Sequence, residues 1–74
     1  MLRVMNVTIN FESLGVTVFG SHLVPRIGEV FVLSGAVGST PSRVTDVHYQ
    51  FHIFDKTKPP EITVFILSEA VAEK

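Results

Sequence analysis

Apolar and polar side chains alternate along most of the chain, which is the pattern of β-strands that bury one face. The first such stretch is residues 2–11, where β-branched residues are frequent. The alternation predicts one buried face and one solvent face for this strand. The residues assigned to the buried face are Met5, Val7, Ile9 and Phe11, and those assigned to solvent are Asn6, Thr8 and Asn10.

Turn residues divide the next part of the chain into shorter strands. Gly15 suits the end of a turn because glycine adopts a positive φ without strain. Pro25 and Gly28 predict a second tight turn, since proline fixes its own φ. The strands predicted around these turns are residues 16–19, a second pairing segment at 23–24, and residues 29–33. Residues 20–22 between the first two either loosen the strand or form a bulge. A loop rich in Gly and Ser follows at residues 35–42.

The longest predicted strand is residues 43–54. The residues assigned to its core face are Thr45, Val47, Tyr49, Phe51 and Ile53. The residues assigned to its other face, solvated over its middle, are Val44, Asp46, His48, Gln50, His52 and Phe54. This alternation is typical of an antiparallel strand with one wet face.

The last predicted strand is residues 61–67, which follows a polar connection at residues 55–60. Both of its faces are largely apolar, so the strand is either covered on both sides or lies at an interface. Ser68 is suited to cap a helix, and residues 68–74 are mostly good helix formers. They predict a short C-terminal helical turn, although seven residues do not hold a helix on their own.

Five or six short strands without a long helix predict one all-β domain over residues 1–74. A small antiparallel barrel is favoured over a sandwich because closure removes exposed strand edges. The turn from Pro25 to Gly28 is followed by Glu29, by Val-Thr-Asp-Val at 44–47 and by Ile-Thr-Val-Phe-Ile at 62–66. This order resembles a group of short, uncharacterised bacterial and mobile-element proteins with an SH3-like small β-barrel. The resemblance covers residues 23–67 and implies the fold only, because that group has no assigned activity.

Composition narrows the classes of function. The chain has 74 residues and no cysteine, which excludes a disulfide framework and thiolate zinc sites. Apolar residues make up 46%, and a chain this short exposes part of them, which favours an interface. No stretch has the length of a secretory signal or a membrane span, so we expect a cytoplasmic protein without a membrane partner.

Few residues have the type and spacing that suggest metal binding or catalysis. His48 and His52 share one face of the longest strand, but four strand residues span about 13 Å, so the two imidazoles do not bind one metal ion. Asp46 is close enough to contact His48. We interpret the three as a solvated stripe, with a pH-sensitive or ligand-contacting surface as the alternative. We therefore expect no catalytic residues, no metal, no cofactor and no enzyme activity.

The remaining hypotheses concern binding. The first is a protein-interaction module that self-associates and contacts an unidentified protein partner. The residues proposed for its surface are Tyr49, Phe54, Phe65, His48, His52 and Arg26. The alternative is a nucleic-acid-binding barrel that uses Arg3, Arg26 and Arg43. The net charge of −1 favours the first, because nucleic-acid binders usually carry a basic excess.

Overall fold

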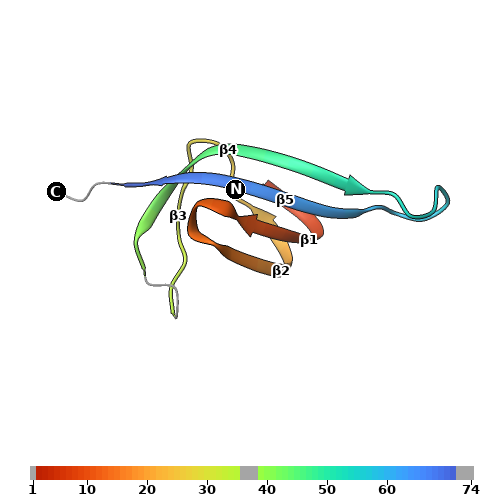
Figure 1. The fold of residues 1–74 in the computed structure, drawn as a ribbon, viewed down its shortest axis with the longest axis horizontal. Coiled ribbons are helices and arrows are strands. Elements are labelled where there is room, and N and C mark those ends of the chain that lie inside the picture. Colours follow the sequence, from red (N-terminus) through yellow and green to blue (C-terminus); the bar gives the residue numbers. More distant parts are fainter. Residues whose placement is uncertain (1, 36–38, 72–74) are drawn as a thin grey trace.

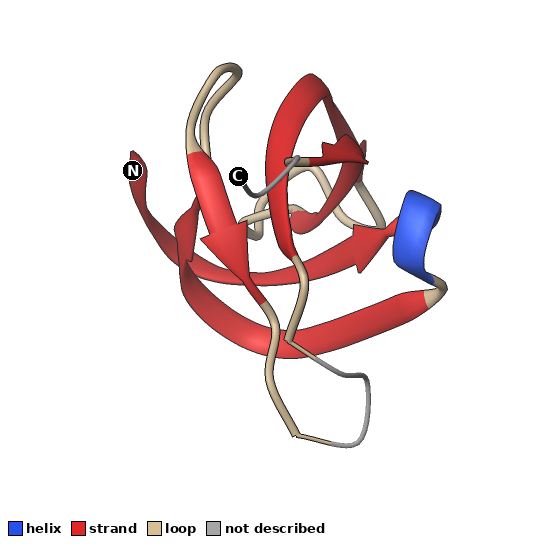
Figure 2. Cartoon of the chain, turned by 90° about the vertical axis from the view of Figure 1, so that its left-hand side faces the viewer, coloured by secondary structure: helices blue, strands red, loops and turns tan. Residues whose placement is uncertain are grey.

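The computed structural model describes residues 2–35 and 39–71, with side chains from residue 6 onwards. Its strands form one five-stranded sheet that curls into a half-barrel (Figure 1 and Figure 2). The elements are β1 (Leu2–Phe11), the 3₁₀ turn η1 (Glu12–Leu14), β2 (Val16–Val24), β3 (Val30–Val32), β4 (Pro41–His52) and β5 (Glu61–Ala70). The predicted all-β class is confirmed, while the closed SH3-like barrel stays a prediction.

The sheet is mixed rather than antiparallel throughout. Its strand order is β2-β1-β5-β4-β3, and β1 runs parallel to β5 from the Thr8–Thr63 pair to the Phe11–Ile66 pair. The other neighbouring strands are antiparallel. The antiparallel prediction was wrong at this one pairing, because no local turn signal fixes the relative direction of the first and last strands.

The core lies on the concave face of the sheet. Val7, Ile9 and Phe11 are buried, which confirms the predicted buried face of β1, although the Met5 side chain lies outside the described residues. The Phe11 ring meets the Phe31 ring at a centroid distance of 5.0 Å. The other buried apolar residues are Val24, Val44, Val64 and Ile66.

A β-bulge in β4 reverses the predicted faces of its first half. Val44 pairs with Ser68, but the next pair is Asp46 with Leu67, so β4 carries one extra residue at this point. Val44, predicted to face solvent, is 1% exposed, and Thr45, predicted to be core, is exposed. One inserted residue moves all preceding side chains to the opposite face, because the side-chain period of a strand is two.

The predicted helical turn at the C-terminal end is wrong over Ser68–Ala70. These residues extend β5 and pair with residues 42–44 of β4, and the Ser68 N–H donates to Ser13 Oγ at 3.0 Å. Sheet partners satisfy the backbone groups that a helix of this length leaves unpaired. Residues 72–74 of the predicted turn lie outside the described residues.

The two edge strands β2 and β3 border the open side of the half-barrel. An apolar hollow of about 240 Å³ opens there. It is lined by Ile9, Phe11, Val18, Ser21, Leu23, Pro25, Phe31, Val32 and Leu33. Pro25 of the predicted turn is one of these lining residues, and in the same turn Gly28 has φ +89° and donates its N–H to the Val44 carbonyl at 2.9 Å. A side chain at that φ is strained, so the turn needs glycine.

Candidate interaction surface

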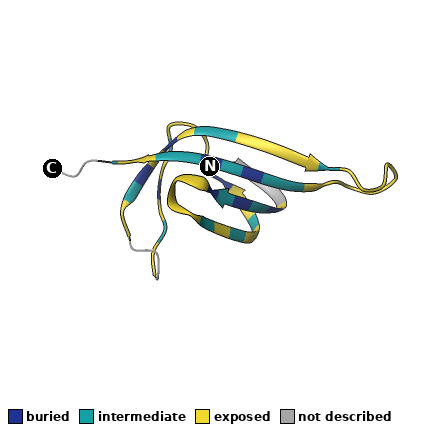
Figure 3. Cartoon of the chain, viewed as in Figure 1, coloured by how far each residue is buried: buried dark blue, intermediate teal, exposed yellow. Residues whose placement is uncertain are grey.

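The distal half of the β4–β5 hairpin projects beyond the core as a two-stranded ribbon (Figure 1). We call residues 49–63 the arm. Its strands keep a regular register, with Gln50 opposite Thr63, Phe51 opposite Ile62 and His52 opposite Glu61. Figure 3 shows that burial falls along this hairpin, from buried and intermediate positions near the core to exposed positions toward its end. The two strands of the arm are thus paired regularly, but their side chains are more exposed than those of the core strands.

The concave face of the arm carries an apolar stripe, formed by Tyr49, Phe51 and Ile62. Tyr49 lies in one row with the buried residues Val64 and Ile9, so the stripe continues the core face outward. Yet Tyr49 is 40% exposed and Phe51 is 57% exposed.

The prediction that Tyr49, Phe51 and Ile53 are core residues was therefore wrong. The alternation correctly grouped Tyr49 and Phe51 on the face that continues the core. However, the pairing of β1 with β5 reaches the arm only at Thr63. Ile62 is half-buried against the core, while Tyr49 and Phe51 are left exposed. Because they were assigned to the core, Phe51 and Ile53 were missing from the predicted interaction surface. One sequence signal could have found them: the strand predicted at 43–54 is longer than its neighbours, so its end must extend past them.

The opposite face of the hairpin is polar around His48. The His48 ring Nε2 lies 3.0 Å from Asp46 Oδ2, and both side chains are largely exposed. Phe65 lies opposite His48 and is half-buried. His52 stacks on the exposed Phe54, with ring centroids 6.2 Å apart. This face matches the solvated stripe expected from the sequence.

Arg26 does not belong to this surface. It lies in the turn between β2 and β3, where its backbone N–H donates to Glu29 Oε1 at 2.7 Å. The structure thus gathers five of the six predicted surface residues on one hairpin. It divides them between two faces, with Tyr49 on the apolar stripe and His48 and Phe65 on the polar face.

The tip of the arm is ordered by Asp55. The Thr57 backbone N–H and hydroxyl donate to Asp55 Oδ1 at 2.9 and 2.8 Å, and the Lys58 N–H donates to the Asp55 carbonyl at 3.0 Å. The two bonds from Thr57 favour the ionised carboxylate and lower the pKa of Asp55 from its ordinary value of 3.8.

This lowered pKa predicts an acid-sensitive arm tip. A depressed carboxylate pKa contributes stability above pH 3.8 and loses it as the pH falls through the lower folded value. In an NMR titration, we expect the Thr57 amide resonance to move with a midpoint below pH 3.8. The Asp55→Asn variant is the control and should remove that titration. A midpoint at or above 3.8 in the original protein would contradict the prediction.

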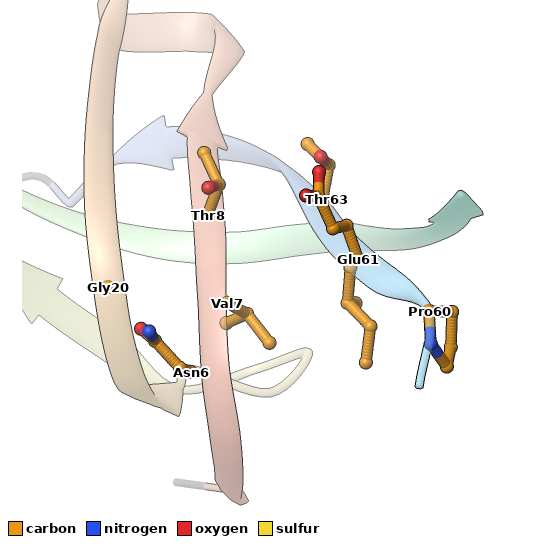
Figure 4. Close-up of a pocket in the computed structure, with 8 residues that line it drawn as sticks. Asn6, Val7, Thr8, Gly20, Pro60, Glu61 and Thr63 are labelled. Carbon is orange, nitrogen blue, oxygen red and sulfur yellow. The ribbon is translucent and has the colours of Figure 1, made fainter. Parts of the chain in front are cut away.

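A polar hollow of about 350 Å³ lies at the base of the arm, where β1 separates from β5 (Figure 4). Its lining residues are Asn6, Val7, Thr8, Gly20, Pro60, Glu61, Ile62 and Thr63. Glu61 is the one ionisable group among them, so the hollow offers no acid–base pair. Among the described residues, no group of three or more His, Cys, Asp or Glu side chains could hold a metal ion.

Two further findings bear on the class of protein. In the described ranges, none of the helical structure is long and apolar enough to cross a membrane. Comparison with protein-family models, with curated proteins and with solved structures finds no match to this chain. Function is therefore inferred from the geometry of the molecule alone.

Proposed function

We propose that this protein is a non-enzymatic interaction module that self-associates through its arm. The observation that carries the proposal is the stripe of Tyr49, Phe51 and Ile62, which continues the core face outward. Its two aromatic side chains are exposed, and Ile62 is half-buried where the stripe meets the core. Aromatic side chains of this kind dominate the binding energy of protein interfaces because they bury large apolar areas. A second copy is the occupant we favour, because the stripe is present on every copy.

The total surface supports this proposal. A compact monomer of 8.2 kDa exposes about 4,500 Å² by the usual scaling with mass. This chain exposes 5343 Å². The excess of roughly 800 Å² is about the area that each partner buries in a stable interface of standard size.

The nucleic-acid alternative has less support. Arg26 is three residues from Glu29, and Arg43 lies opposite Glu69 across β4 and β5. Each of these arginines therefore has a carboxylate neighbour that weakens the positive potential available to a phosphate backbone. The side chain of Arg3 lies outside the described residues.

We expect sedimentation equilibrium to show a monomer–dimer equilibrium in the micromolar to millimolar range. Replacing Phe51 by Asp puts a charge in the stripe, and loss of one central aromatic anchor weakens association by roughly 30-fold or more. The matched control is Phe19→Asp, which changes an aromatic residue on β2 that is 79% exposed but lies outside the arm. Phe19→Asp should leave the dissociation constant within a factor of about three, a typical result for a residue outside an interface.

Two outcomes would overturn the proposal. A strict monomer at millimolar concentration would exclude self-association. An equal loss of association in Phe51→Asp and Phe19→Asp would show that the arm is not the interface. Circular dichroism of both variants establishes beforehand that the fold is retained.

A further inference from the structure

The free strand edges of the sheet differ in how well they are protected against pairing. β2 is irregular, with two register shifts in its pairing with β1 and a positive φ at Gly20, and β3 has only three residues. Bulges and short lengths are features by which natural sheets block edge-to-edge pairing. Neither edge offers a long, regular template to another strand.

Beyond its bulge, the outer edge of β4 is longer and more regular than either of these edges. β3 pairs with β4 only over residues 41–43, and the backbone of Val44 bonds to Gly28 and Glu29. Beyond the bulge, residues 46–52 have β5 on one side and no strand on the other within the described part of the chain. This segment contains no proline and no lysine. It is the longest regular free edge that the structure describes.

One hydrogen bond shows which residues direct their backbone groups outward at this edge. The Val47 N–H donates to the side chain of its neighbour, Asp46 Oδ1, at 3.1 Å. Alternate residues of an antiparallel strand direct their N–H and C=O groups to the same side. Tyr49 and Phe51 therefore share the outward orientation of Val47 and can donate to and accept from a further strand.

We propose that the outer edge of β4 pairs antiparallel with the same edge of a second copy, about a two-fold axis at Tyr49. The proposal rests on the self-association proposed above and specifies its geometry. Tyr49 is the midpoint of the free edge at 46–52, so an axis there pairs the whole free segment with itself. Because the axis is perpendicular to the sheet, the concave faces of both copies lie on the same side of the combined sheet. The two arm stripes therefore lie next to each other and form one continuous stripe.

Side-chain chemistry favours the same register. With the axis at Tyr49, Asp46 lies opposite the partner's His52, and Val47 lies opposite the partner's Phe51. An imidazole can hydrogen-bond to the Asp46 carboxylate, and cross-strand pairs that hydrogen-bond or bring apolar side chains together stabilise a sheet. An axis at Gln50 would instead place His48 opposite the partner's His52, and an axis at His48 would place that residue opposite its own copy. Both alternatives oppose two imidazoles, whereas the axis at Tyr49 opposes two aromatic rings, a pair that stabilises a sheet.

The register also ends where the free edge ends. His52, the last residue of β4, faces the partner's Asp46 in this register. The next paired residue beyond the partner's bulge is Val44, whose backbone is already bonded to the Pro25–Gly28 turn and Glu29. Phe54, which is 80% exposed, therefore comes next to that turn, where Ile27 is 64% exposed. Edge pairing thus brings these two apolar side chains together and places the two stripes side by side.

Cysteine cross-linking tests this geometry directly, because the natural sequence contains no cysteine. In the Tyr49→Cys variant, the two Cα atoms would face each other about 5.5 Å apart, which is within the range of a disulfide. In the Gln50→Cys control, the two cysteines lie on a diagonal about 7–8 Å apart and do not bridge readily. We expect mild oxidation to convert the Tyr49→Cys protein to a covalent dimer at least tenfold faster than the Gln50→Cys protein.

A mixture of two variants fixes the register. Asp46→Cys and His52→Cys should cross-link to each other on mixing, while neither protein alone should form a dimer at a comparable rate. A dimer in sedimentation without these cross-linking preferences would overturn the edge pairing but leave self-association standing. A chain that stays monomeric at millimolar concentration, with no preferential cross-link, would overturn both proposals.

Discussion

Replacing Val44 by Asn is expected to unfold the protein or leave it marginally folded, whereas the same change at Thr45 is tolerated. Val44 is 1% exposed in the core, and Thr45 is exposed. Val44→Asn loses about 1.5–3 kcal/mol of apolar burial. It also buries an amide without a partner, which costs a further 1–3 kcal/mol or so. Together these losses approach the total stability of about 4–11 kcal/mol expected for a chain of this length.

Urea denaturation of both variants, followed by circular dichroism, measures this difference. The Thr45→Asn variant should lose at most about 1 kcal/mol, because the change affects mainly strand propensity on an exposed face. Dilute samples keep the protein monomeric, so that association does not add to the apparent stability. A Thr45→Asn variant less stable than Val44→Asn would contradict the bulge and restore the uninterrupted alternation expected from the sequence.

The comparison of these two neighbours shows where sequence patterns succeed and where they fail in this fold. The buried face formed by Val7, Ile9 and Phe11 was predictable because apolar and polar side chains alternate without interruption along this part of β1. The turn at Gly28 was predictable because proline and glycine act locally. The bulge after Val44 was not predictable, because no glycine or proline marks it.

Two further features could not be predicted from the sequence: whether other strands cover the arm, and in which direction β1 pairs with β5. Alternation says that Tyr49 and Phe51 share a face, but not whether other strands reach far enough to bury them. The parallel pairing of β1 with β5 depends on contacts between the two ends of the chain. For the candidate surface, the sequence identified the hairpin that carries it. It misassigned Phe51 to the core, since an arm stripe and a core face have the same pattern.

Ile66 and Ile53 test the distinction between core and arm in the same hairpin region. Ile66 is fully buried on β5, the middle strand of the sheet, and lies between Phe11 and Val47 in the register. Ile66→Ala should destabilise the monomer by about 2–5 kcal/mol, because it removes apolar contacts and leaves a cavity. For a domain of this size, that lowers the melting temperature by about 8 °C or more.

Ile53→Ala is the matched control, since it deletes the same atoms from a side chain that is 67% exposed. In dilute solution it should change the free energy of unfolding by at most about 0.5 kcal/mol, as is usual for surface substitutions. Equal destabilisation by the two variants would mean that the arm is packed in the monomer, and the proposed interface would then have no free surface. A large effect for Ile66→Ala alone separates the roles of the hairpin: its proximal half stabilises the monomer, and its distal half remains free to bind a second copy.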